Sequence, residues 1–293
     1  MPASLQRPES TPSTLFQWAK WLLLVGGLLV LVPLGLITGC QSQMIYFPRP
    51  YPPGVTQKWA ASTGGKLLDF TTSQGQQRAF LLGKLDQPEH LWIVCGGNGT
   101  IALEWSPWLR ANARSDDAWL LVDFPGYGDC DGAPSPGRIK ETFANVVPLA
   151  AAQLGWSLPR DRAKLRFFGH SLGAAACLIA ASDFEIQRGV LLAPFTSTMD
   201  MAREVTGLPL GFLVWHRFDN TARLGELATR EGTQVIILHG TQDEVIPVTM
   251  SRVLAAKFPQ LIDFRELPNL HHNDVQDGSP EALANALREA GER

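Results

Sequence analysis

Short apolar runs recur at regular intervals along most of this chain, and helix-favouring stretches separate them. The runs are almost continuously apolar, which is typical of strands buried on both faces of a parallel sheet. They cover residues 91–95, 118–124, 165–168, 189–195, 233–240 and 261–267. The stretches between them predict helices at about 102–114, 138–154, 172–182, 249–258 and 280–291. This alternation predicts an α/β fold, with a mainly parallel sheet and helices on both of its faces.

Two further apolar runs, residues 66–72 and 77–85, precede the alternating units and are joined by the sequence SQGQ. Strand-like runs with a short Gly-containing connection predict a β-hairpin. We expect this hairpin to form an antiparallel edge on the otherwise parallel sheet.

The longest interval between predicted strands covers residues 196–232. It is long enough for a small helical cap but too short for a separate domain. Its apolar residues could belong to a lid, contact a membrane or pack in the core, and core packing is the default expectation for apolar side chains.

The first 40 residues differ from the rest of the chain. Residues 1–20 are rich in Pro, Ser and Thr, and residues 21–38 then run without a charge. That length lies at the lower limit for a membrane span and also suits the apolar region of a secretory signal. We therefore expect a signal or anchor segment over residues 1–40 and a single domain over residues 41–293.

The apolar segment ends in Ile37-Thr38-Gly39-Cys40, which resembles the lipobox of bacterial lipoproteins. In such proteins the cysteine is lipidated and becomes the new N-terminus. The resemblance implies lipid attachment at Cys40, and the alternative is an uncleaved transmembrane signal anchor. Either arrangement would tether residues 41–293 to a membrane, on the exported (periplasmic or extracytoplasmic) side.

Composition excludes several classes of function. The net charge is −3 and no basic patch stands out, so a nucleic-acid partner is not expected. The four cysteines, at positions 40, 95, 130 and 177, fit no metal-binding spacing, and the glycines at 96–99 lack the dinucleotide-binding spacing. We expect no metal and no cofactor. Cys95 and Cys130 both follow predicted strands at one sheet edge, so we expect them to be neighbours that could oxidise in an exported domain.

A candidate nucleophile lies where a predicted strand gives way to a predicted helix. Residues 169–173 read Gly-His-Ser-Leu-Gly, which is the G-x-S-x-G pattern of the nucleophile elbow. In that tight turn Ser171 points out of the sheet edge, and Gly169 and Gly173 stand where side chains would collide. The pattern by itself is weak evidence, because a chain with 27 glycines can contain it by chance.

The partners that a serine nucleophile needs follow downstream in the expected order of serine, acid and histidine. Asp243 comes just after one predicted strand, and His271 and His272 come just after the last one. Spacing alone does not choose between the two histidines. Asp219 is interpreted as a helix cap and Asp123 as the acceptor of a turn.

An oxyanion hole is expected from two backbone amides. One is the N–H of Leu172, which follows the nucleophile at a helix N-terminus, where the helix dipole favours negative charge. The other is placed at Asn98, in the glycine-rich sequence CGGNGT after the strand at 91–95.

These motifs together resemble the α/β-hydrolase superfamily over residues 44–291. More narrowly, the chain is similar to membrane-tethered hydrolases related to the α/β-hydrolase-domain depalmitoylases and to prolyl-aminopeptidase-like proteins. The sequences MIYFP, DFPGYGDCDGAPS, GHSLGAAAC, LLAPFTS, RFDN, HGTQDEVIP and HHND carry this resemblance. It implies His272 as the base, because the catalytic histidine of these hydrolases directly precedes Asn-Asp. Two positions depart from the family pattern: Gly96 replaces the histidine of His-Gly-Asn, and Cys130 replaces a serine.

The sequence therefore predicts a membrane-anchored serine hydrolase. Ser171 would attack the acyl carbonyl of an ester or thioester, His272 would take its proton, and Asp243 would orient His272. The preference for an ester or thioester follows from the resemblance and the short cap. A peptidase of the same fold and a non-catalytic binding protein are the alternatives.

Overall fold

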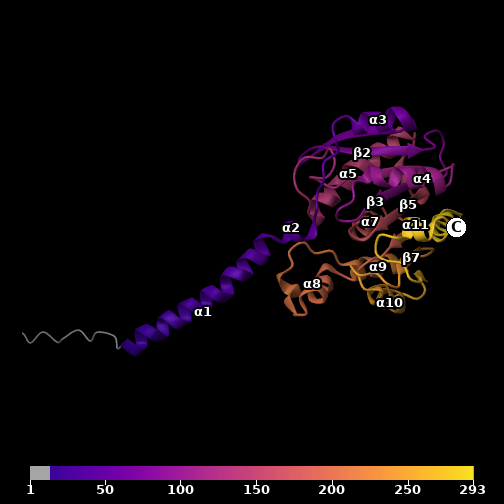
Figure 1. The fold of residues 1–293 in the computed structure, drawn as a ribbon. Coiled ribbons are helices and arrows are strands. Elements are labelled where there is room, and N and C mark those ends of the chain that lie inside the picture. Colours follow the sequence, from indigo (N-terminus) through magenta and orange to yellow (C-terminus); the bar gives the residue numbers. More distant parts are fainter. Residues whose placement is uncertain (1–13, 293) are drawn as a thin grey trace, which may run out of the picture. The chain divides into compact units, whose positions relative to one another are not determined.

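The computed structural model describes residues 14–292. The chain divides into two compact units between Gln41 and Ser42. The first unit contains the helix α1 (Thr14–Gly39) (Figure 1). In the part of the chain that the structure describes, no helix combines the length and the apolar character needed to cross a membrane.

The second unit is built on one sheet that contains all the strands of the described residues. Its eight strands follow the order β1-β2-β4-β3-β5-β6-β7-β8. The pairs β1·β2 and β2·β4 are antiparallel and all others are parallel, as the hairpin and the alternating units predict. The strands are β1 (Lys66–Thr72), β2 (Gly75–Gly83), β3 (Leu91–Cys95), β4 (Ala118–Val122), β5 (Leu165–His170), β6 (Arg188–Leu192), β7 (Gln234–Gly240) and β8 (Ile262–Leu267).

Helices surround this sheet (Figure 1). Some of them agree with the predicted positions to within a few residues. They are α4 (Ser106–Asn112), α5 (Pro136–Gln153), α7 (Leu172–Asp183), α10 (Val248–Lys257) and α12 (Pro280–Glu292). The other helices of the described residues outside α1 are α2 (Gln41–Ile45), α3 (Val55–Thr63), α6 (Leu158–Asp161), α8 (Thr198–Thr206), α9 (Asn220–Ala228), α11 (Val275–Gly278) and the 3₁₀ turns η1 (Ala102–Trp105), η2 (Arg162–Lys164) and η3 (Leu210–Leu213).

The helices cover both faces of the sheet, and β3 shows how. The Cys95 thiol lies beside Cys177 of α7. The Trp92 ring lies against Gly291 of α12. Side chains three positions apart on a strand point to opposite faces, so α7 and α12 lie on opposite sides of the sheet. Every residue of β3, β4 and β5 is buried, which is why these strands read as continuous apolar runs.

The cap between β6 and β7 contains α8, η3 and α9. Core packing, the default expectation for its apolar residues, is wrong for part of it. Val205, Leu208, Phe212 and Trp215 are 53–77 % exposed, whereas Phe218 is buried. Asp219 accepts a hydrogen bond from the Ala222 N–H and so caps α9, as expected.

The helix α3 was not predicted from the sequence. It begins after Gly54 and ends before Gly64, and both glycines have left-handed backbone angles. Such a glycine after a helix is a common stop signal, so Gly64 was the available sequence clue.

The four cysteines are free thiols. The Cys130 sulfur accepts a hydrogen bond from the Arg78 N–H of β2, whereas the Cys95 thiol on β3 contacts Cys177. Because β4 separates β2 from β3 in the sheet, the prediction that Cys95 and Cys130 are neighbours able to form a disulfide is wrong.

Candidate active site

Ser171 lies at the junction of β5 and α7 in a strained conformation. Its φ is 55° and its ψ is −119°, in a region that non-glycine residues rarely adopt. A Cβ on Gly169 would lie 2.4 Å from the Gly173 carbonyl oxygen, and a Cβ on Gly173 would lie 2.1 Å from the Cys95 carbonyl oxygen. Both contacts are sterically forbidden, so the turn requires glycine at both positions. Ser171 is 8 % exposed and lies at the carboxyl edge of the sheet.

Asp243 lies just after β7, in a loop that satisfies both of its carboxylate oxygens. Oδ1 accepts hydrogen bonds from the N–H groups of Val245 and Ile246, at 2.9 and 2.7 Å. Oδ2 lies 2.7 Å from His272 Nδ1 and 3.2 Å from His239 Nε2. Burial raises the pKa of this carboxyl, but the hydrogen bonds from His239, His272 and Ile246 outweigh that effect and hold the pKa well below its usual range. Asp243 is therefore ionised at neutral pH and can orient and stabilise a histidine.

His272 is buried and joined to Asp243, whereas His271 faces solvent. The His271 ring is half exposed, and its Nδ1 lies 3.0 Å from Oε2 of Glu244. The structure thus brings together the predicted acid and His272, and gives the other histidine a different partner.

The hydroxyl of Ser171 is not hydrogen-bonded to either histidine among the described residues. Ser171 and His272 are nevertheless close neighbours, because His170, which precedes Ser171, has its ring centroid 4.9 Å from that of His272. Since Nδ1 of His272 faces Asp243, Nε2 is the nitrogen left for the serine. Catalytic hydrogen bonds are often long until a substrate is bound.

The predicted oxyanion turn lies against the elbow. A Cβ on Gly97 would lie 3.6 Å from the Ser171 Cβ and 3.6 Å from His170 Nδ1. The Asn98 carbonyl oxygen accepts hydrogen bonds from the Phe47 N–H, at 3.0 Å, and from the Tyr127 hydroxyl, at 2.5 Å. These contacts fix the turn through its carbonyl. Among the described residues the N–H groups of Asn98 and Leu172 have no acceptor, so both remain available to an oxyanion.

Sequence reasoning missed two histidine contacts around this site. The first is made by His239 of β7, which hydrogen-bonds Asp243. Its Nδ1 lies 2.7 Å from the Ser251 hydroxyl and its Nε2 lies 2.8 Å from the Ile246 carbonyl oxygen. The second is made by His170, whose Nε2 lies 3.2 Å from the backbone carbonyl oxygen of His272. Its position beside the serine was the only sequence signal for that contact.

A cavity of about 110 Å³ opens beside the candidate base. Its lining includes Trp105, His170, Leu192 and His272. The cavity has room for a few water molecules or a small substituent of a substrate next to the His272 imidazole.

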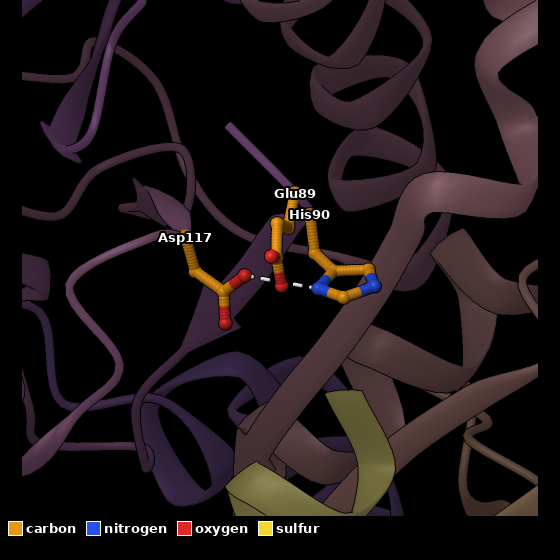
Figure 2. A group of neighbouring side chains, drawn as sticks. All are labelled: Glu89, His90 and Asp117. Atoms are coloured by element: carbon orange, nitrogen blue, oxygen red, sulfur yellow. Dashed lines mark hydrogen bonds and ion pairs between the residues drawn. The ribbon is translucent and has the colours of Figure 1, made fainter. Parts of the chain in front are cut away.

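One further cluster of metal-binding residue types occurs in the described part of the chain, at the opposite edge of the sheet. The ligand atoms of Glu89, His90 and Asp117 all lie within 4.8 Å of one another (Figure 2). The Arg114 guanidinium already pairs with Glu89, at 2.5 Å, and lies 3.9 Å from Asp117. The Arg114 guanidinium thus supplies the positive charge that a metal ion would otherwise bring, and this cluster is interpreted as structural.

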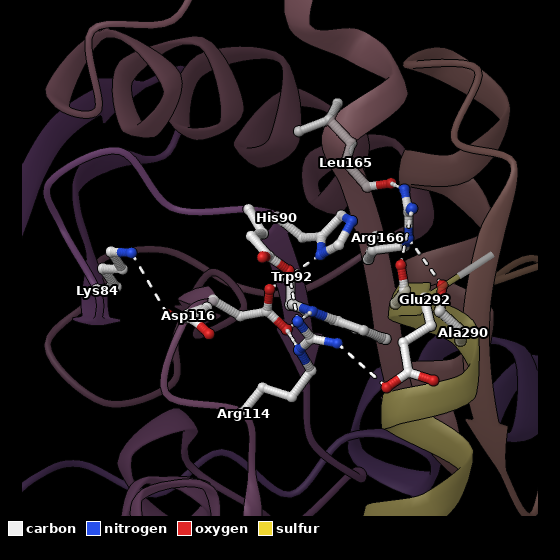
Figure 3. A network of polar contacts seen from close by, with 12 residues as sticks. Lys84, His90, Trp92, Arg114, Asp116, Leu165, Arg166, Ala290 and Glu292 are labelled. Atoms are coloured by element: carbon white, nitrogen blue, oxygen red, sulfur yellow. Dashed lines mark hydrogen bonds and ion pairs between the residues drawn. The ribbon is translucent and has the colours of Figure 1, made fainter.

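The same network continues into the C-terminal helix. Arg114 pairs with Glu292 of α12, and the buried Arg166 of β5 donates to the Ala290 carbonyl oxygen at 2.8 Å (Figure 3). Trp92 Nε1 donates to Asp117 at 3.0 Å. These contacts fasten α12 to the amino ends of the central strands, away from Ser171.

Comparison with known families supports the interpretation of this fold. A model described as the alpha/beta hydrolase family matches residues 92–233, a segment that contains the oxyanion turn and the elbow. The chain belongs to the α/β-hydrolase superfamily. The matched segment ends before Asp243 and His272, so the catalytic roles of these two residues remain predictions.

Two relatives of this α/β hydrolase illustrate the extent of the likeness. An uncharacterized protein of Mycobacterium tuberculosis is 27 % identical over 277 residues, which cover 90 % of this chain and 92 % of the relative. The human alpha/beta hydrolase domain-containing protein 17B is 25 % identical over 159 residues, which cover 53 % of this chain and 50 % of that protein.

Solved structures show the same fold at low sequence identity. An esterase from Pyrococcus furiosus has a TM-score of 0.60 and 14 % identity, and the match covers 84 % of this chain and 96 % of that one. Est1E from Butyrivibrio proteoclasticus, solved with ferulic acid bound, has a TM-score of 0.56 and 19 % identity, with 76 % and 96 % covered.

Proposed function

We propose that this protein is a serine hydrolase that cleaves carboxylic ester or thioester bonds with Ser171, His272 and Asp243. The observation that carries the proposal is the 2.7 Å hydrogen bond between His272 and Asp243 next to the strained elbow of Ser171. A buried carboxylate, a histidine that it orients and a serine at the carboxyl edge of the sheet form the arrangement that activates a hydroxyl.

In the proposed reaction, the Ser171 oxygen attacks the acyl carbonyl carbon while its proton moves to Nε2 of His272. Asp243 stabilises the imidazolium that forms, and the N–H groups of Asn98 and Leu172 donate to the oxyanion. The tetrahedral intermediate collapses, the C–O or C–S bond to the leaving group breaks, and the leaving group takes the proton from His272. Water then attacks the acyl-enzyme by the same steps and releases the acid and the free serine.

The choice of an ester or thioester follows from the similarity to the α/β-hydrolase-domain proteins and from the modest cap. The esterase names of the two structural neighbours are consistent with it. Phe212 and Trp215 of the cap are exposed apolar side chains, which suits substrates with apolar acyl chains.

The protein is also proposed to be attached to a membrane on the exported side, through its N-terminal segment. The support is Cys40, which follows the end of α1 directly and is exposed.

Labelling with a fluorophosphonate, which reacts with activated serines, tests the proposed chemistry. We expect wild type to label and to hydrolyse a short-chain ester. Ser171→Ala should not label, and its turnover should fall at least about a thousandfold, since the nucleophile is lost. Ser62→Ala, which changes an exposed serine on α3, is the matched control. A folded Ser171→Ala protein with full turnover would falsify the assignment of Ser171 as the nucleophile. Preferential cleavage of peptides by the wild type would identify the protein as a peptidase in place of an esterase or thioesterase.

A further inference from the structure

We propose that His170 is a positioning residue that holds the loop of the catalytic base against the strand of the nucleophile. Its Nε2 lies 3.2 Å from the His272 backbone carbonyl oxygen, and the two rings lie 4.9 Å apart at an interplanar angle of 36°. The inference rests on the proposed function, because it assigns His170 a role relative to Ser171 and His272.

The geometry fixes the tautomer of His170. A carbonyl oxygen only accepts hydrogen bonds, so Nε2 must carry the proton. Burial, and next the neighbouring His272, lower the pKa of His170 to about 3. The ring is therefore neutral at physiological pH and does not repel the positive charge that His272 acquires during the reaction.

His170 is well placed to transmit position because it is the last residue of β5 and Ser171 follows it directly. Its own ring is held by Trp105, in an edge-on contact with centroids 6.1 Å apart. The His170 side chain, fixed at the end of β5, thus donates a hydrogen bond to the backbone of His272 in the loop that follows β8.

Three contacts together define where His272 stands. Asp243 holds its ring nitrogen, Glu244 accepts from its backbone N–H at 3.4 Å, and His170 donates to its backbone carbonyl. The contacts with Asp243 and Glu244 come from the loop after β7, so among the described residues only the His170 hydrogen bond joins the base directly to the nucleophile strand. Losing it should let the imidazole drift relative to Ser171 without disturbing the rest of the substrate site.

Two substitutions separate the hydrogen bond from the ring packing. His170→Phe keeps an aromatic ring but removes the donor. His170→Gln places an amide N–H close to the position of Nε2 and keeps the hydrogen bond. His90→Gln is the matched control, since His90 is also bonded to another residue but lies at the opposite edge of the sheet.

The experiment measures kcat and KM for a soluble ester, with hydrogen exchange of the 271–274 backbone as a readout independent of activity. We expect His170→Phe to lower kcat by about tenfold to a hundredfold with little change in KM, because misplacement of a reacting group acts on the transition state. Exchange over 271–274 should quicken. His170→Gln should recover most of the kcat and the protection, and His90→Gln should keep both.

Thermal denaturation identifies any variant that fails to fold, and the comparison of Gln with Phe is then made at a lower temperature where both are folded. Wild-type kcat and exchange in His170→Phe would overturn the inference. So would equal losses in the Phe and Gln variants. Failure of the wild type to label or to hydrolyse any ester would instead overturn the proposed function, and the two failures are distinguished by that one sample.

Discussion

At the scale of single residues, adjacent side chains of similar chemistry have different environments in this protein. His271 and His272 are neighbours, and so are Asp243 and Glu244, yet the structure pairs them in a fixed way. His272 bonds Asp243 in a buried position, and His271 bonds Glu244 at the surface. An exposed contact of this kind contributes little to stability, whereas the buried hydrogen bond can orient a catalytic ring.

This pairing leads to a prediction for the two histidines. His272→Ala should lower kcat/KM for an ester by roughly 10⁴, because triad members act as a unit. His271→Ala should cost less than about tenfold, since it removes only an exposed contact. Steady-state kinetics on both variants tests this. A larger loss in His271→Ala than in His272→Ala would move the role of base to His271.

At the scale of elements, a buried carboxylate joins three segments that are distant in sequence. Asp123, just after β4, accepts hydrogen bonds from the Ala102 N–H of η1 and from the Tyr51 hydroxyl, at 2.7 and 2.8 Å. The Tyr51 hydroxyl in turn accepts from the Leu103 N–H at 3.0 Å. The entering segment of the domain is thereby fastened beside the oxyanion turn, which Phe47 also holds.

Asp123 should make the stability of the domain depend on pH. Burial raises the pKa of this carboxyl from 3.8 to about 7, against the opposing hydrogen bonds from Ala102 and Tyr51. The unfolded chain therefore loses its proton at lower pH than the folded protein does. The free energy of unfolding should then fall as the pH rises from about 4 to about 7, and remain low above that.

Asp123→Asn removes this titration. Its amide oxygen can still accept from the Ala102 N–H, whereas its NH₂ group would donate to the Tyr51 hydroxyl oxygen in place of accepting from it. Between pH 5 and pH 8 the variant should lose less stability than wild type, by at most about 3 kcal/mol. Urea denaturation at both pH values measures the difference. Asp86→Asn, an exposed carboxylate, is the control and should match wild type. A pH dependence in Asp123→Asn identical to that of wild type would show that Asp123 is not the responsible group.

At the scale of the whole molecule, the hydrolase domain follows a segment of different composition. The division falls between Gln41 and Ser42, directly after Cys40 and the apolar run. A lipid attached to Cys40, as proposed, would therefore be close in sequence to the start of the domain and would tether the proposed active site to a membrane.

Mass spectrometry of the mature protein, isolated from membranes of a bacterial host, tests this attachment. We expect an N-terminus at Cys40 that carries lipid, and Cys40→Ala should release the protein from the membrane fraction or leave it unprocessed. An intact segment of residues 1–40 in the wild-type protein would contradict lipid attachment at Cys40.

The sequence by itself determined the fold class, the order of most elements and the elbow. Short, nearly continuous apolar runs separated by helix-favouring stretches are typical of strands buried on both faces, and Gly169 and Gly173 are required because any Cβ would meet backbone. Sequence also supplied Asp243 and both histidines, since parallel strands bring their carboxyl ends to one edge. It did not reveal α3, the exposure of the cap or the partners of Cys95, because these depend on which surfaces meet.

Only the tertiary structure decided how His170, His239 and Glu244 are used. The local sequence around each of them is that of a packing or surface residue. Their hydrogen-bond partners include residues of other segments of the chain: His272 for His170, Ser251 for His239 and His271 for Glu244. The partner is chosen by the distance and direction between strand ends, which no local pattern encodes. The same reason separates His271 from His272: the backbone of their loop turns one imidazole toward Asp243 and the other toward solvent.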